Sequence, residues 1–294
     1  MRKAYQSDLS DAEWSCLEPH LPAPRATGRP KMHATREILN AIFYVVRGGC
    51  AWRLLPNDFP PWKTVYHYFR FWRLDGTWER MHSALRQRVR VRLKRDPQPS
   101  AAIVDSQSVK TTGVGGKERG YDGAKKVKGR KRHLLVDTQG LVLEARVHNA
   151  NIPDRDGIML LLEASSPDRL PRLSHVWLDA GYTGQEKGAG WVERTLGWTA
   201  EIVRHPPKPA SEEVMMRWLR EFNKEGLAID PKKFVSEEGP SRAFLPKRWV
   251  VERTFSWLGQ NRRLSKDYER LTESSEAFIY AAMSRLMARR LARS

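Results

Sequence analysis

The chain has 294 residues, and its 52 lysines and arginines outnumber its 34 aspartates and glutamates, which gives a net charge of +18. Such an excess predicts nucleic acid as the partner, because basic side chains displace the counterions that condense on phosphates. No apolar run approaches the roughly 18 residues of a membrane-spanning helix, the N-terminus lacks the apolar stretch of a signal peptide, and two cysteines are too few for a disulfide framework or a zinc site. We therefore expect a soluble cytoplasmic protein.

Residues 1–97 are predicted to form an all-helical domain. A capping box of Ser10 and Glu13 opens the first helix, and a second at about 33–47 stops at a pair of glycines. A third follows Pro60-Pro61, with Phe69 and Trp72 in its apolar stripe, and a fourth covers about 77–94. Small helices joined by short turns are compatible with a helix-turn-helix DNA reader and equally with a plain helical bundle.

Residues 98–294 show a different pattern, in which short apolar runs alternate with amphipathic stretches. Strands are predicted at about 101–108, 132–138, 141–147, 174–179 and 200–203. Helices are predicted at about 154–164, around 191, over most of 247–269 and from about 273 onward, with a short polar insert at about 205–245. This succession predicts a mixed α/β domain whose helices cover both faces of a sheet.

Three carboxylates occupy positions that indicate metal binding. Asp105 lies within the first strand, Asp179 ends the fourth, and Glu252 lies on the amphipathic helix that follows the polar insert. If the first and fourth strands are neighbours and the helix packs across them, the three acids repel one another unless hard divalent cations are present. Two such ions activate water or a 3′-hydroxyl at a phosphodiester. The alternative is that each acid serves a separate salt bridge.

Basic residues gather in two places that we predict to contact DNA. One is a glycine-rich stretch between the first two strands, whose charge suits tracking of phosphates, although a solvated loop is the alternative. The other is the Glu252 helix and the residues after it, where Trp249 is a candidate for stacking on an extruded base. The candidates are Lys110, Lys125, Lys126, Lys128, Arg130, Lys131, Arg132, His133, Arg248, Trp249, Arg253, Arg262, Arg263 and Lys266.

The local sequences around these residues resemble bacterial insertion-sequence transposases. The matching stretches are 104–110, 123–133, 178–184 and 248–258, together with 9–14 and 50–56 near the N-terminus. They extend over nearly the whole chain and are similar to the DDE transposases of the insertion-sequence-four/five group, in the branch named for insertion sequence five.

The resemblance implies an RNase H-like catalytic core with Asp105, Asp179 and Glu252 as catalytic residues and ligands of two Mg²⁺ or Mn²⁺ ions. The related signature around the glutamate also has Tyr, Arg and Lys at fixed steps. Arg248 matches the arginine, whereas Leu245 and Gly259 occupy the tyrosine and lysine positions. Arg262, Arg263 and Lys266 are then candidates to replace the lysine.

The expected function is DNA transposition: binding of terminal inverted repeats, cleavage at the element ends and transfer of the 3′-hydroxyl ends to target DNA. Double-stranded DNA is the expected partner, and synapsis of two ends implies a homodimer or a larger assembly. Two alternatives stay open, an RNase H-like nuclease or resolvase without strand transfer, and a non-catalytic DNA-binding regulator.

Overall fold

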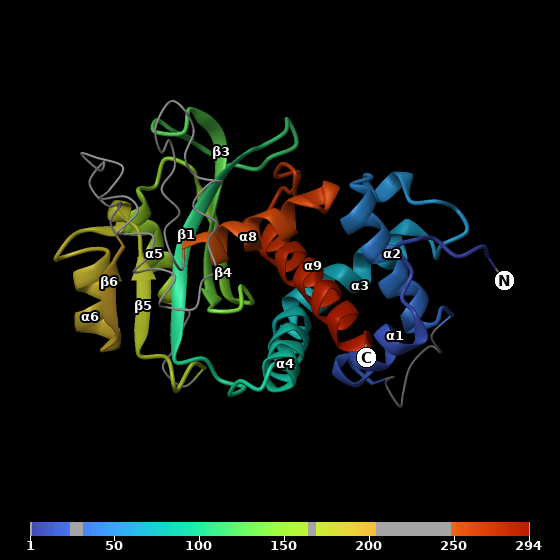
Figure 1. Ribbon diagram of the computed structural model, residues 1–294. Helices are drawn as coiled ribbons and strands as arrows, with labels where there is room; N and C mark the ends of the chain where they lie inside the picture. Colours follow the sequence, from blue (N-terminus) through green and yellow to red (C-terminus); the bar gives the residue numbers. More distant parts are fainter. Residues whose placement is uncertain (1, 24–31, 164–168, 204–247, 294) are drawn as a thin grey trace, which may run out of the picture.

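A computed structural model describes residues 2–23, 32–163, 169–203 and 248–293 (Figure 1). The predicted polar insert at about 205–245 lies outside these ranges. In the described part, a sheet with its own helices occupies one side of the molecule and a group of helices the other, with the C-terminal helix running between them (Figure 1). No helix described here is both long and apolar enough to cross a membrane.

The N-terminal region is helical, as predicted. Ser10 Oγ accepts a hydrogen bond from the Glu13 amide, while the Glu13 side chain accepts one from the Ser10 amide, so the capping box is confirmed. The second helix ends where Gly49 adopts a left-handed conformation with φ of +74°. Phe69 and Trp72 are buried, as expected. The elements are α1 (Asp11–Leu17), η1 (Glu18–His20), α2 (Thr35–Gly48), η2 (Trp52–Leu54), α3 (Trp62–Leu74) and α4 (Thr77–Arg92).

The described part of the chain after α4 builds a mixed six-stranded sheet. Its strands are β1 (Ala101–Lys110), β2 (Gly120–Asp122), β3 (Val127–Asp137), β4 (Val142–Asn149), β5 (His175–Leu178) and β6 (Thr199–Ile202). The order is β2-β3-β1-β5-β6, and β4 also pairs with β3. β3 is antiparallel to β1, β2 and β4, whereas β5 is parallel to both β1 and β6. The predicted pairing of the strands that carry Asp105 and Asp179 is therefore confirmed.

Two apolar clusters cover the two faces of the sheet, because successive strand residues point to opposite sides. Val104 and Leu135 pack with α5 (Asp154–Leu162) and α6 (Ala189–Leu196) on one face. Ile103 and Leu134 join a larger cluster on the other, with the N-terminal helices, α8 (Arg248–Gly259) and α9 (Thr272–Ala292). The N-terminal helices thus share a core with α9, and the domain boundary near residue 97 stays a prediction.

Helix α8 is shorter than expected, since most of 247–269 was predicted to be helical. The amide of the Asn261 side chain donates to the carbonyls of Trp257 and Leu258 and so caps the last turn. A short 3₁₀ helix, η5 (Arg262–Leu264), follows. Arg262, Arg263 and Lys266 consequently do not continue the helical face of Glu252.

Candidate active site

Asp105 and Asp179 lie at the same level on two adjacent parallel strands. Ala101 pairs with His175 and Ile103 pairs with Trp177, and each aspartate comes two residues after the last of these partners. Both belong to the lining of one small hollow, together with apolar residues of β1 and β5 and with Val203. The sheet thus places two acids that are 74 positions apart in the sequence at one point.

Each of the two aspartates is oriented by the backbone beside it. The Oδ1 atom of Asp105 accepts a hydrogen bond of 2.7 Å from the Ser106 amide. Asp179 is the N-cap of η3 (Ala180–Tyr182), and its Oδ1 accepts a bond of 2.8 Å from the Gly181 amide. Oxygen donors of this kind are the ligands that hard divalent cations prefer, so the chemistry of the pair fits Mg²⁺ or Mn²⁺.

Glu252 reaches this region on α8, which packs against β1 and β3. Val251 and Phe255 are buried on the sheet side, while Glu252 is exposed. Thr254 Oγ1 donates a bond of 2.8 Å to the carbonyl of Gly140 and ties the helix to the β3–β4 turn. Within the described ranges, no three Asp, Glu, His or Cys side chains are grouped closely enough to hold a metal ion. A shared site for Asp105, Asp179 and Glu252 therefore stays a prediction.

A further carboxylate, Asp154, lies beside the pair. It opens α5, and its Oδ1 accepts hydrogen bonds of 2.8 Å from Ser106 Oγ and 2.8 Å from Lys131 Nζ. Gly181 separates it from Asp179, since a Cβ at that glycine would come within 3.0 Å of Asp179 and 3.5 Å of Asp154. The sequence pattern marked Asp154 only as a helix start, because nothing local shows that this helix begins next to β1.

Beneath these acids, three buried rings form one hydrogen-bonded chain. His148 Nδ1 contacts the Asn149 carbonyl at 2.9 Å and must carry a proton, so its Nε2 accepts from His133 Nδ1 at 2.7 Å. His133 Nε2 then accepts from the Tyr182 hydroxyl at 2.8 Å. Burial and the neighbouring His148 and Lys131 hold the pKa of His133 well below its ordinary value. Burial and the three aspartates raise the pKa of Tyr182 well above its own. The His133 and Tyr182 rings are therefore both neutral, and His133 has a structural role.

Several predicted DNA contacts turn out to be buried, which was not expected. Arg130 donates to the carbonyls of Glu118, Glu269 and Arg270 and pairs with Asp267 at 3.2 Å. The buried candidates are Arg130, Lys131, Arg132, His133 and Arg263. These five side chains are buried, and apart from Nε of Arg132 their polar atoms are engaged within the protein, so they do not belong to the surface available to DNA.

The same stretch was expected to be a flexible groove or a solvated loop; residues 120–122 and 127–133 are strand, and turns or irregular backbone make up most of the rest. Arg132 donates to the carbonyls of Leu264 and Lys266, and burial lowers its pKa to about 10, so it stays charged at neutral pH. Arg263 pairs with Glu269. Arg130 and Arg132 thus fasten the segment after α8 to β3, whereas the Arg263–Glu269 pair lies within that segment. The predicted contacts that stay accessible or half-buried are Lys110, Lys125, Lys126, Lys128, Trp249, Arg253, Arg262 and Lys266, while the side chain of Arg248 is not described.

Comparison with known proteins matches two family models to this chain. One, described as "Transposase DDE domain", covers residues 96–287, and the other, described as "Putative transposase of IS4/5 family", covers residues 9–82. The second match lies on the helical region and the first on the sheet with α8 and α9.

Two relatives from Burkholderia cepacia are also similar. The "Insertion element IS402 uncharacterized 16.2 kDa protein" is 32% identical over 116 residues, which are 37% of this chain and 77% of the relative. The "Putative transposase for insertion sequence element IS402" is 28% identical over 151 residues, which are 51% of this chain and 59% of the relative. The sheet order and the position of its acidic pair agree with the RNase H-like core that a DDE domain implies. The chain therefore belongs to the DDE transposases of the IS4/5 type.

Proposed function

We propose that this transposase binds the terminal inverted repeats of its element, cleaves DNA at the element ends and transfers the 3′-hydroxyl ends to target DNA. The observation that carries the proposal is the placement of Asp105 and Asp179 side by side on parallel strands, with the Glu252 helix packed against β1. An acidic pair at a strand edge has little structural value, because like charges repel.

Asp105, Asp179 and Glu252 are the proposed ligands of two Mg²⁺ or Mn²⁺ ions. When bound, the ions polarise the phosphoryl oxygens and stabilise the attacking and leaving oxygens of an in-line displacement. Water attacks phosphorus in the cleavage step and the freed 3′-hydroxyl attacks in the transfer step, so the chain supplies no covalent nucleophile. Lys125, whose Nζ donates to the Ser106 carbonyl at 3.0 Å, is the proposed contact for a phosphate next to Asp105.

The wider DNA surface is proposed to include the accessible cations near this edge of the sheet. Lys110 ends β1, Lys125 and Lys126 lie in the turn between β2 and β3, and the cations of η5 follow the Glu252 helix along the chain. The proposed contacts are Lys110, Lys125, Lys126, Lys128, Arg248, Trp249, Arg253, Arg262 and Lys266. Because two element ends must be held together, we propose that two or more copies assemble on DNA.

The Asp105→Asn variant tests the catalytic part of the proposal. It keeps the shape of the side chain and removes its charge, so we expect wild-type affinity for duplex DNA carrying the terminal repeats and loss of cleavage with Mg²⁺ or Mn²⁺. Asp156→Asn is the matched control, because Asp156 lies on α5 and pairs with Lys187 instead of facing the hollow. Cleavage by Asp105→Asn at the wild-type rate would refute the assignment.

The products distinguish the alternatives. Joined molecules on a sequencing gel are expected for a transposase, whereas cleaved ends without joined products would indicate a nuclease or resolvase. Binding by the wild-type chain with no cleavage in either metal would leave the DNA-binding regulator as the function.

A further inference from the structure

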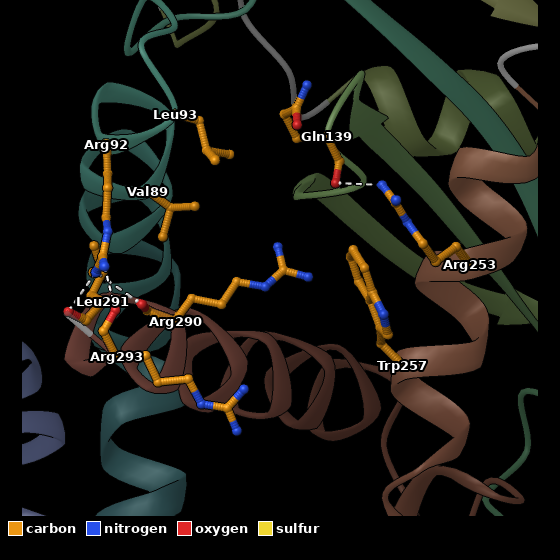
Figure 2. A pocket seen from close by; sticks show the side chains of 9 residues that line it. All are labelled: Val89, Arg92, Leu93, Gln139, Arg253, Trp257, Arg290, Leu291 and Arg293. Carbon is orange, nitrogen blue, oxygen red and sulfur yellow. Dashed lines mark hydrogen bonds between the residues drawn. The ribbon is translucent and has the colours of Figure 1, made fainter. Parts of the chain in front are cut away.

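A second hollow, open on one side, lies between the ends of α4 and α9, the β3–β4 turn and α8 (Figure 2). It has a volume of about 350 Å³ and shares no lining residue with the hollow at Asp105 and Asp179. Four arginines line it, namely Arg92, Arg253, Arg290 and Arg293. Among the described residues, no Asp or Glu lines it. A hollow surrounded by charge of one sign concentrates ions of the opposite sign, which indicates an anionic ligand.

Two of these arginines share one aromatic ring. The Cζ atom of Arg290 lies 4.3 Å from the centroid of the Trp257 ring and that of Arg253 lies 4.8 Å from it. Figure 2 shows the indole between the two guanidinium groups. Burial lowers the pKa of Arg253 and of Arg290, the charge of Arg253 lowers that of Arg290 further, and the nearby carboxylate of Asp137 acts in the opposite direction on both. The protein thus holds two like charges against one ring, and an anion bound near both relieves their repulsion.

Part of this cationic wall is held rigidly and part is open to a ligand. Arg253 donates to the Gln139 carbonyl at 2.9 Å, while its Nε is buried without a hydrogen-bond partner in the described structure. Arg92 donates to the carbonyls of Arg290, Leu291 and Arg293 and so covers the end of α9. A helix end contributes roughly half a negative charge, so the ends of α4 and α9 do not cancel four guanidinium groups.

The chemistry of the wall selects a phosphate over a nucleobase. Two guanidinium groups already stack on the indole of Trp257, so no ring face is left for a base to stack on. The pocket instead presents positive charge and hydrogen-bond donors. Guanidinium groups bind phosphate oxygens through paired hydrogen bonds. We propose that this pocket binds a backbone phosphate of DNA, at a point apart from the acidic pair. The proposal rests on the proposed function only in that the chain handles DNA.

The salt dependence of DNA binding tests this site. We expect Arg290→Gln combined with Arg293→Gln to weaken binding of a fluorescein-labelled duplex about tenfold, measured by anisotropy. The slope of log affinity against log salt should become shallower by roughly 0.9 for each lost phosphate contact. Arg289→Gln is the matched control: it removes the same charge from the neighbouring position, which does not line the pocket and faces Glu13 at 3.5 Å. Its slope should equal that of the wild type.

Two further variants keep the test decisive. Arg290→Lys retains the charge and should recover most of the affinity lost in Arg290→Gln. Arg293 is exposed at the end of α9, so Arg293→Gln alone must reduce the slope if the double variant does not fold.

Three results would overturn the proposal. The first is a wild-type slope in the folded double variant, and the second is an equal loss in Arg289→Gln. In the third, inorganic phosphate stabilises the wild type but not the double variant, while both proteins bind the duplex equally well. The pocket would then bind only a small anion. Cleavage is scored separately, so a wild-type chain that binds DNA but does not cut it contradicts the proposed function and leaves the slope test intact.

Discussion

Glu276 offers a quantitative test of how α9 joins the sheet. Its Oε1 accepts a hydrogen bond of 2.8 Å from the amide of Val147 in β4, and its side chain is only 12% exposed. Burial raises its pKa to about 7, with Glu273 and Glu79 acting in the same direction, and the Val147 bond and Arg146 oppose the shift. At a pH between the ordinary and the raised pKa, this carboxyl group is therefore protonated in the folded protein and ionised in the unfolded chain.

The sign of the resulting pH dependence follows directly. Between the ordinary pKa of 4.5 and the folded value of about 7, the folded state binds more protons, so stability falls as the pH rises. Above the folded pKa the full penalty is about 3 kcal/mol, and the part lost between pH 5 and pH 8 is about 2.5 kcal/mol. Glu276→Gln keeps an oxygen acceptor for Val147 and removes the charge. It should abolish this part of the pH dependence and stabilise the protein at pH 8.

Urea unfolding of both proteins at pH 5 and pH 8 measures the effect. For each protein, the free energy of unfolding at pH 8 is subtracted from that at pH 5. Comparing this difference between the variant and the wild type isolates the contribution of Glu276 from those of other titrating groups. Glu18→Gln, at an exposed glutamate, is the control and should follow the wild type. If Glu276→Gln also follows the wild type across this range, the burial argument is refuted.

Three further substitutions test other joints of the fold. Gly140→Ala places a Cβ 2.9 Å from Thr254 Oγ1 at a φ of +78° and should cost about 1–3 kcal/mol in urea unfolding; a wild-type midpoint would show that the turn relaxes freely. Tyr182→Phe leaves the buried Nε2 of His133 without its donor and should cost about 1–3 kcal/mol, and an unchanged stability would contradict the ring chain. Arg90→Met leaves the fully buried carboxylate of Asp137 without its cation and should cost about 3–5 kcal/mol by thermal or urea unfolding, with a neutral result contradicting the pairing.

The arrangement of strands was largely predictable because each strand has a strong local signal. Apolar runs bounded by turn residues located β1, β4, β5 and β6 to within two residues at either end, whereas β3 begins five residues before its predicted start and β2 was not predicted. The order of strands and helices along the chain then limited the sheet to few topologies. The proximity of Asp105 and Asp179 followed from that order, since parallel neighbours bring their corresponding ends together.

The candidate site was less predictable where it depends on distant segments. Arg130 and Arg132 stand two residues apart and therefore point to the same face of β3. Their partners are backbone carbonyls of residues 264–270, and no residue pattern marks a carbonyl as an acceptor for a side chain more than 100 positions away. The place of Asp154 beside the acidic pair was not predicted either, because its partners Ser106 and Lys131 come from the distant strands β1 and β3.

The net positive charge still indicates nucleic acid as the partner, although several lysines and arginines are buried. Among the described residues, seven lysines and arginines are buried, and so are six aspartates and glutamates. These two groups nearly cancel, so within the described ranges the excess positive charge belongs to the surface. Burial decides which cations are accessible to DNA. The arginines of β3 are buried, whereas others, such as Arg290 and Arg293, line an open hollow. Composition thus predicted the class of partner, whereas only the packing of α4, α8 and α9 locates a place where a phosphate would bind.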